Sequence, residues 1–271
     1  MTSVPQLETI AITLFPNGVT EIALNRPKRY NALSPQAYKD WLAAFQWAKE
    51  CDEVKVVVLT GRGKFYSSGQ ELGMPDLGDD PMVEMNRRLN TTQGIVTEMI
   101  HFPKLLIGAV NGPAIGFGCT TLALCDVVYS VPDATFNTPF MRFGFCAEGC
   151  SSYLFPKIMG NSKANEMLLM GRTFSAQEMV DCGFISRLLP QENFNKNILD
   201  LAAAAAEFSV EAMKVTKKLV RGVDMDVLDG VNEEEMRQLI DRMTSADSLE
   251  SIMKFIEEGQ KKKAAKAGAK L

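Results

Sequence analysis

The stretch 55–61, KVVVLTG, contains an unbroken run of aliphatic residues and ends in a glycine. Such a run is typical of a strand that is buried on both faces, as in a parallel sheet covered by helices. Two further apolar runs, LLIGAVNG at 105–112 and DVVYSV at 126–131, have the same character. We therefore expect these three segments to be strands of a parallel sheet.

Helical patterns fill the intervals between these runs. Ser34 is a candidate N-cap with Pro35 in the first helical position, and apolar residues recur at helical spacing after it. Ser175 to Glu178 forms a capping-box sequence. The other predicted segments are a hairpin of 7–14 and 19–24, helices ending near 100, at 116–124 and near 151–170, and a strand at 184–190.

The alternation of strands and helices predicts an α/β fold. From about residue 198 the strand patterns stop and only helical patterns remain, including DLAAAAAEF. We therefore expect a core over 1–197 that carries the active site. Residues 198–271 are expected to form a helical extension. Its basic tail is interpreted as a solubilising end and not as a ligand contact.

Charge and composition narrow the class of function. The chain has 271 residues, and its 29 Lys and Arg against 33 Asp and Glu give a net charge of -4. No broad basic surface for nucleic acid or anionic membrane is expected from this balance. No apolar run is long enough for a membrane span, and the N-terminal segment lacks a secretory pattern, so we expect a soluble chain that is not secreted by that route.

The cysteines and the single histidine favour neither a metal site nor a redox site. Six cysteines scattered over this length do not suggest a disulfide framework. Cys146 and Cys150 are separated by three residues, whereas the cysteines of the usual C-x-x-C pairs are separated by two, and packing is the favoured interpretation. His101 cannot form a site with several histidines, and a role in a nucleophilic triad is disfavoured against a structural role at a helix end.

Two glycine-containing loops follow predicted strands. FYSSGQEL at 65–72 and NGPAIGFGCTT at 111–121 lie beyond strand ends, where ligand sites of α/β proteins gather. Turn geometry alone explains the glycines of either loop, and the second loop lacks the third glycine of a dinucleotide fingerprint. If both loops direct backbone N–H groups at one oxygen, they form an oxyanion hole that fits a thioester substrate.

Glu148 is the one acidic residue in FGFCAEGCSS at 143–152. An apolar setting would raise the pKa of this carboxyl group toward the range in which it both accepts and donates a proton. A single glutamate in a loop is equally a candidate cap for the helix that follows it. The residues alone leave these two interpretations open.

Four blocks of the sequence together resemble the crotonase (enoyl-CoA hydratase/isomerase) superfamily. They are NRPKRYNAL at 25–33, FYSSGQEL at 65–72, NGPAIGFGCTTLALCD at 111–126 and FNTPFMRFGFCAEGCSSYLFPKIMG at 136–160. The last block is most similar to peroxisomal Δ3,Δ2-enoyl-CoA isomerases. The resemblance implies a spiral of ββα units with a C-terminal helical region that packs subunits into homotrimers or hexamers.

The resemblance also implies a site. The oxyanion donors would be the backbone N–H groups of Gln70 and Phe117, and Glu148 would be the catalytic base. Coenzyme A, as part of the fatty acyl-CoA substrate and not as a separate cofactor, would lie along two segments. The substrate-binding residues implied are Lys28, Ala32, Ser68, Gly69, Gln70, Glu71, Leu72 and Phe117. Two alternatives remain open: Lys28 is a solvated charge, and Glu71 is a solvent-facing loop residue. Asp126 is interpreted as structural.

Departures from the family pattern indicate the reaction. The two glutamates of family hydratases are replaced here by Thr120 and Phe140, so ordinary hydration is disfavoured. Glu148 matches the isomerase subgroup, in which one carboxylate moves a proton from C2 to C4 of a 3-enoyl-CoA without a metal. Another acyl-CoA reaction and a non-catalytic acyl-CoA-binding role are the alternatives. The terminal Ala269-Lys270-Leu271 resembles a peroxisomal import signal and predicts a peroxisomal location and an import-receptor partner.

Overall fold

The computed structural model describes residues 3–71 and 81–268 of the chain. Within them, six strands form one sheet in the order β1-β2-β3-β4-β6-β9. Strand β1 pairs antiparallel with β2, and every later neighbour is parallel. The strands are β1 (Ile10–Leu14), β2 (Val19–Leu24), β3 (Val56–Gly61), β4 (Leu105–Val110), β6 (Val127–Ser130) and β9 (Arg187–Leu188).

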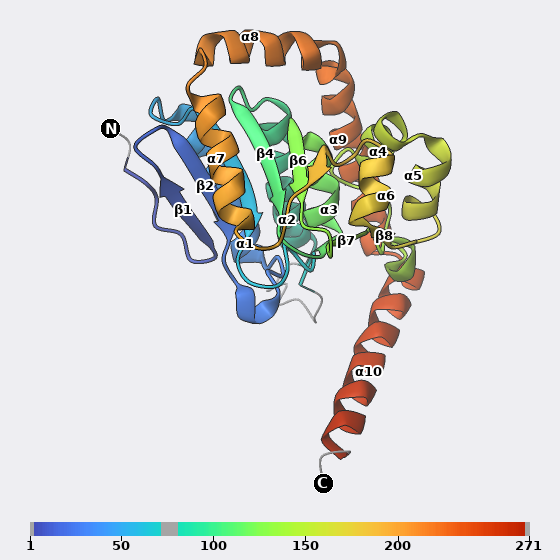
Figure 1. The fold of residues 1–271 in the computed structure, drawn as a ribbon. Coiled ribbons are helices and arrows are strands. Elements are labelled where there is room, and N and C mark those ends of the chain that lie inside the picture. Colours follow the sequence, from blue (N-terminus) through green and yellow to red (C-terminus); the bar gives the residue numbers. More distant parts are fainter. Residues whose placement is uncertain (1–2, 72–80, 269–271) are drawn as a thin grey trace.

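The aliphatic run at 55–61 forms β3, all of whose residues are buried. It lies between β2 and β4, with Val56 opposite both Val19 and Leu105. Helix α7 (Phe194–Ala206) covers one face of the sheet, and helices α1 (Pro35–Glu50) and α2 (Pro81–Ile100) cover the other (Figure 1). The continuous apolar pattern of the central strands thus reflects burial on both faces.

Helix α1 begins where the sequence predicts. The Ser34 side chain accepts a hydrogen bond from the Ala37 N–H at 3.2 Å, which satisfies one of the unpaired groups at the helix start. Trp41 and Phe45 are fully buried on its inner face. The ring of Phe45 packs edge-on against that of Phe102 at 5.4 Å, a favourable aromatic geometry that ties α1 to the segment before β4.

A second, three-stranded sheet was not predicted. Its order is β5-β7-β8, formed by β5 (Ala114–Ile115), β7 (Thr135–Asn137) and β8 (Phe174–Ser175). Helix α3 (Phe117–Thr120) follows β5, and helices α4 (Ser151–Met159), α5 (Asn161–Leu168) and α6 (Ala176–Asp181) surround this sheet (Figure 1). The capping box of Ser175 and Glu178 is formed as predicted.

Two predicted elements differ from the structure. The helix expected near 151–170 is broken between α4 and α5 at Gly160, whose φ of 77° places it outside helical geometry. The strand expected at 184–190 is reduced to β9, because the N–H groups of Phe184 and Ile185 bond the Met179 carbonyl at the end of α6. These two side chains are buried in the core, which accounts for their apolar pattern.

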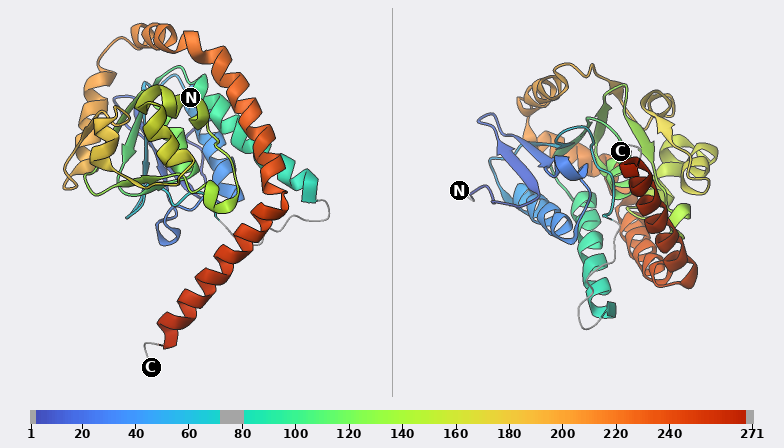
Figure 2. Two further views of the ribbon diagram at one scale, coloured as in Figure 1. Left: turned by 90° about the vertical axis from the view of Figure 1, so that its right-hand side faces the viewer. Right: turned by 90° about the horizontal axis from the view of Figure 1, so that it is seen from below.

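The C-terminal region is helical, as expected. It consists of α7, α8 (Val210–Arg221), α9 (Met225–Met243) and α10 (Ala246–Gly268), and α10 projects away from the rest of the molecule (Figure 2). The predicted boundary at 197/198 falls inside α7, about one turn after its start. Short 3-10 turns lie at Pro27–Arg29, Thr121–Leu124, Met141–Phe143 and Gly222–Asp224. No helix among the described residues has the length and apolarity of a membrane span.

Candidate active site

The two glycine-containing loops lie side by side. A short parallel bridge joins Leu33 to Gln70, in which the Leu33 N–H donates to the Gly69 carbonyl at 2.9 Å. The Ile115 N–H donates to the Ser67 carbonyl at 3.0 Å, which ties the first loop to β5 and hence to the second loop. The bridge leaves the N–H of Gln70 directed away from Leu33, because the two bridge bonds use the groups of the flanking residues.

Two backbone N–H groups at this junction are unpaired. Those of Gln70 and Phe117 have no hydrogen-bond partner within residues 3–71 and 81–268. Phe117 is the first residue of α3, where N–H groups lack an intrahelical acceptor. Gly116, immediately before it, has a φ of 56°. The arrangement has the character of an oxyanion hole, in which free donors meet the charge that develops on a carbonyl oxygen.

Glycine at position 69 is required by the close approach of the two loops. A Cβ on Gly69 would lie 2.8 Å from the Ile115 carbonyl oxygen, and the φ of this residue is 78°. On the facing loop, a Cβ on Gly116 would lie 3.8 Å from the Gly69 Cα. The glycines that suggested turns in the sequence therefore also bring the two strand ends into contact.

Glu148 contacts the same short helix that carries the Phe117 donor. Its side chain is 6% exposed, and its Oε1 lies 3.3 Å from the hydroxyl of Thr120, the last residue of α3. Gly149 allows this approach, because a Cβ there would lie 2.7 Å from the same Thr120 Oγ1. The candidate base and one oxyanion donor are thus fixed to opposite ends of one helical turn.

The environment of Glu148 raises the pKa of its carboxyl group to about 8. Desolvation by burial is the largest cause, and the charge of Glu235 adds to it, while the hydrogen bond from Thr120 works in the opposite direction. A carboxyl group with this pKa exchanges a proton readily near neutral pH, as a general acid-base catalyst must.

Aromatic side chains from α1 pack against the first residue of α3. The rings of Tyr38 and Trp41 pack against Phe117 at centroid distances of 5.3 Å and 5.6 Å. The pKa of Tyr38 is raised by burial and, to a smaller extent, by the charge of Glu148, which places this phenol within the electrostatic reach of the candidate base. Sequence analysis did not single out Tyr38, because its helical spacing is that of an ordinary core residue.

Of the predicted coenzyme A residues, Lys28 lines a cavity of about 400 Å³, together with Pro27, Tyr30, Gly63 and Lys64. Lys28 and Lys64 bring two cationic groups to this cavity, and Lys64 was not predicted. The Ser68 N–H donates to the Tyr30 carbonyl at 2.9 Å, so this candidate lies against the same segment. Ala32 lies close by in the chain, and Leu72 lies outside the described residues.

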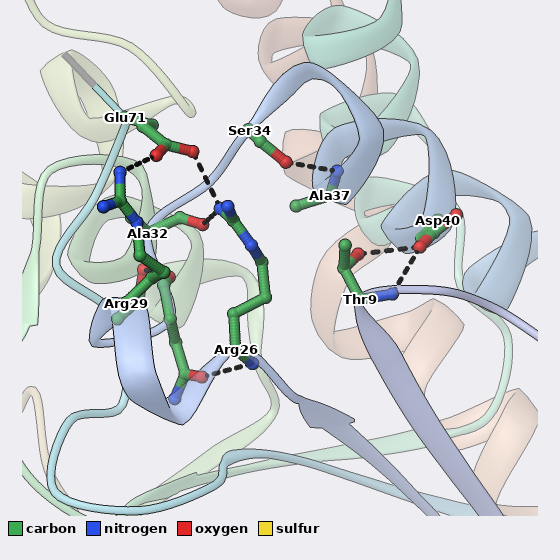
Figure 3. A network of polar contacts seen from close by, with 10 residues as sticks. Thr9, Arg26, Arg29, Ala32, Ser34, Ala37, Asp40 and Glu71 are labelled. Carbon is green, nitrogen blue, oxygen red and sulfur yellow. Dashed lines mark hydrogen bonds and ion pairs between the residues drawn. The ribbon is translucent and has the colours of Figure 1, made fainter. Parts of the chain in front are cut away.

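Glu71 is held by two arginines (Figure 3). Its carboxylate lies 2.9 Å from Arg26 Nη1 and also pairs with Arg29. Partial burial works against ionisation, but the hydrogen bonds from Arg29 and Arg26 lower the pKa of Glu71 overall. Arg26 also donates to the Ala32 carbonyl at 2.6 Å, so the network ties the loop of Gln70 to the turn that carries Lys28.

Other residues singled out from the sequence have structural contacts. His101 Nε2 lies 3.0 Å from Asp229, and Asp126 pairs with Lys217 at 2.7 Å and with Arg221 at 3.2 Å. All six cysteines are free thiols. Phe140 is buried. Across the part of the chain that the structure describes, no group of three or more His, Cys, Asp or Glu side chains is arranged to hold a metal ion.

Residues 15–264 match the family profile described as Enoyl-CoA hydratase/isomerase. The chain belongs to this family. Among solved structures, an enoyl-CoA hydratase/isomerase from Pseudoalteromonas atlantica T6c superposes with a TM-score of 0.82 at 27% identity, covering 93% of this chain and 98% of the other. The crotonase-like fold expected from the sequence is thereby confirmed.

Members of the family with delta-isomerase names are similar to the chain. Enoyl-CoA delta isomerase 2 of Rattus norvegicus is 38% identical over 88% of this chain and 61% of its own length. Enoyl-CoA delta isomerase 3, peroxisomal, of Mus musculus is 35% identical over 89% of this chain and 76% of its own. The chain thus spans about three fifths of the length of the first of these relatives. Chromodomain Y-like protein of Homo sapiens is also similar, at 34% identity over 89% of this chain and 41% of its own length.

Proposed function

We propose that the protein is a Δ3,Δ2-enoyl-CoA isomerase that converts 3-enoyl-CoA esters to trans-2-enoyl-CoA in the β-oxidation of unsaturated fatty acids. The observation that carries this proposal is the buried Glu148, with a pKa of about 8, whose carboxyl group contacts Thr120 at the end of the helix whose first N–H group is free. The delta-isomerase names of the relatives in rat and mouse support it.

In the proposed reaction one carboxylate makes both proton transfers. Glu148 removes a proton from C2 of the substrate, and the electron pair of the C2–H bond delocalises to give a dienolate. The N–H groups of Gln70 and Phe117 donate to its thioester oxygen, and each such donor contributes about 3 kcal/mol to the transition state. Protonated Glu148 then delivers the proton to C4, the double bond moves to C2–C3, and the carbonyl is restored. The sequence of steps needs no second acid and no separate cofactor.

The binding of the substrate is proposed from the residues around this centre. The coenzyme A part would follow Ala32 and the 68–72 segment, with Lys28 at its phosphates and Lys64 as a second cation in the same cavity. Lysine binds phosphate as a point charge. The Glu71 carboxylate, paired with Arg26 and Arg29, is proposed to hold this segment in place and to lie beside the bound substrate.

The other superfamily reactions are weaker candidates. A hydratase needs a second carboxyl group to work with its base, and Thr120 and Phe140 occupy the positions where such groups are expected. A hydrolase or a non-catalytic acyl-CoA-binding role fits the family as a whole, and the relatives of the chain include proteins with chromodomain names. Strongly perturbed pKa values gather at functional sites, so the buried Glu148 with its raised pKa favours the enzyme.

Two assays separate these possibilities. Purified protein is mixed with trans-3-hexenoyl-CoA, and the conjugated enoyl thioester is followed in the ultraviolet. The isomerase predicts turnover of this substrate and slow hydration of crotonyl-CoA. If no conjugated product forms above the buffer background, the isomerase is rejected. Rapid hydration of crotonyl-CoA would favour the hydratase-like reaction, and binding without turnover would favour the passive role.

We further propose that the protein forms a homotrimer or hexamer and is carried to the peroxisome. Large apolar side chains on and beside α8 are exposed, among them Phe208 at 69%, Leu219 at 75% and Val223 at 83%. Such a patch is typical of an interaction surface. Sedimentation analysis tests the assembly. Fluorescent fusions with and without Ala269-Lys270-Leu271, which lie outside the described residues, test recognition by the import receptor.

A further inference from the structure

The backbone that follows Glu148 is held by helix α9. The Cys150 N–H donates to Glu235 Oε2 at 2.7 Å, and the Ser152 N–H donates to Glu235 Oε1 at 2.9 Å. Glu235 is 6% exposed and comes from the middle of α9. Both oxygens of one buried carboxylate therefore accept hydrogen bonds from the backbone of the two residues that flank the start of α4.

The local backbone needs this support. Gly149 and Cys150 both have positive φ values, 68° and 59°, and for Cys150 this is an uncommon conformation for a residue with a side chain. Cys150 is also the N-cap of α4, yet its own side chain makes no capping hydrogen bond. The free N–H groups at this helix start are instead satisfied by a carboxylate, which also complements the positive end of the helix dipole. A strained turn of this kind persists only where surrounding contacts fix it.

Other contacts of the C-terminal helices hold the same loop. The Arg242 Nε donates to the Gly144 carbonyl at 2.8 Å, and the Ser248 hydroxyl donates to the Phe143 carbonyl at 2.9 Å. These contacts reach the loop before Glu148, whereas Glu235 reaches the loop after it. Of these three residues, only Glu235 places a negative charge that acts on Glu148.

Burial and hydrogen bonding act in opposite directions on the carboxyl group of Glu235. The charge of Glu235 acts on Cys146, Glu148 and Cys150, and Arg242 and Asp229 act on the two cysteines, respectively. From other elements, the side chains that respond to the charge of Glu148 are Tyr38 and Cys119, whose pKa values it raises. Burial raises the pKa of Glu235, but the hydrogen bonds from Ser152 and Cys150 oppose this by stabilising its ionised form.

We propose that Glu235 is a positioning residue for the isomerase reaction, which fixes the turn after Glu148 through two N–H groups and places a second negative charge beside the base. This role rests on the function proposed above. It gives the C-terminal helices a part in catalysis that is separate from assembly. Glu235 itself does not touch the reacting atoms.

The test compares Glu235→Gln with Glu234→Gln, the same change at the neighbouring exposed position of α9. Glutamine keeps the size and one acceptor but removes the charge. The midpoint of the pH dependence of kcat/KM should therefore fall by about one pH unit, the effect of losing a nearby like charge. Glu234→Gln should leave it unchanged. A Glu235→Gln enzyme with the wild-type midpoint would overturn the proposal.

A second readout does not require turnover. Titration of the Glu148 carboxyl carbon by NMR of ¹³C-glutamate-labelled protein, assigned with Glu148→Gln, should show the same fall in Glu235→Gln. If that fall occurs in a protein that isomerises nothing, the proposed function fails, while the action of Glu235 on the Glu148 carboxyl group stands. If glutamine prevents folding, Glu235→Asp keeps the charge on a shorter side chain and should lower kcat with little change in KM. Unchanged kcat in that variant would refute the role.

Discussion

The hydrogen bond between Thr120 and Glu148 predicts how turnover depends on pH. Burial and the charge of Glu235 raise the pKa of Glu148 to about 8, and the Thr120 hydroxyl partly opposes them by stabilising the carboxylate. Thr120→Val removes this hydroxyl at nearly constant volume. A hydrogen bond to a charged group contributes about 1.5 kcal/mol or more at good geometry. The separation of 3.3 Å is long for two oxygens, so we take roughly 0.7 to 1.4 kcal/mol, or about 0.5 to 1 pKa unit.

The sign of the effect follows from the need for an ionised base. Loss of the hydroxyl raises the pKa of Glu148, so the limb on which activity increases with pH moves to higher pH. With a starting pKa of about 8, this shift lowers the ionised fraction at pH 7 by about three- to ninefold. The kcat/KM for trans-3-hexenoyl-CoA should fall by that factor at pH 7 and recover toward wild type in alkaline buffer.

The matched control is Thr121→Val. Thr121 is equally buried, and its hydroxyl donates to the Phe117 carbonyl at 2.7 Å without contacting Glu148. This variant should keep the wild-type midpoint. A Thr120→Val enzyme whose midpoint is unchanged or lower, or a Thr121→Val enzyme with the same upward shift, would refute the assigned role of the Thr120 hydroxyl.

Three further changes test other parts of the account. Gly118→Ala would place a Cβ 2.6 Å from the Ser67 Cβ and force α3 away from the Gln70 loop, so steady-state kinetics should show a larger loss in kcat than in substrate affinity. Lys28→Ala should raise KM for coenzyme A esters with little change in kcat, and an unchanged KM would place the phosphates elsewhere. Asp126→Asn removes a carboxylate that is 17% exposed and pairs with Lys217 and Arg221, so urea denaturation should show a loss of about 3 kcal/mol. A loss below about 0.5 kcal/mol, typical of a surface pair, would contradict that assignment.

The central sheet can be predicted from sequence because its strands are buried on both faces. That burial leaves an almost continuous apolar pattern at β3 and β4. The second sheet cannot be predicted in the same way. Strands β5 and β8 have two residues each, too few for any periodicity, and they exist because long-range packing brings them beside β7.

The candidate site is only partly visible in the sequence. The glycines beside Gln70 and Phe117 mark the two loops, and Glu148 is conspicuous among apolar neighbours. The partner that holds its loop is not visible, because Glu235 lies 85 residues beyond Cys150 in the chain and belongs to an ordinary helical pattern. Tyr38 is hidden for the same reason, since a helix face directed at a site has the same periodicity as one directed at the core.

The support of the Glu148 loop by α9 connects the fold to the chemistry. A carboxylate that must lose and regain a proton at two carbon atoms needs a fixed position relative to both, and a displacement of about 1 Å can cost about a hundredfold in rate. Here the base is fixed from both sides, by α3 through Thr120 and by α9 through Glu235. The apolar surroundings then set its proton affinity.

The most direct test of the central claim is the rate at which Glu148→Gln converts trans-3-hexenoyl-CoA. Glutamine preserves the shape and the contact with Thr120 but cannot take up the C2 proton. With one residue responsible for both proton transfers, we expect wild type and the exposed control Glu192→Gln to turn over alike, and kcat in Glu148→Gln to fall at least about a hundredfold with substrate binding retained. Turnover by Glu148→Gln within a few fold of wild type would contradict the account.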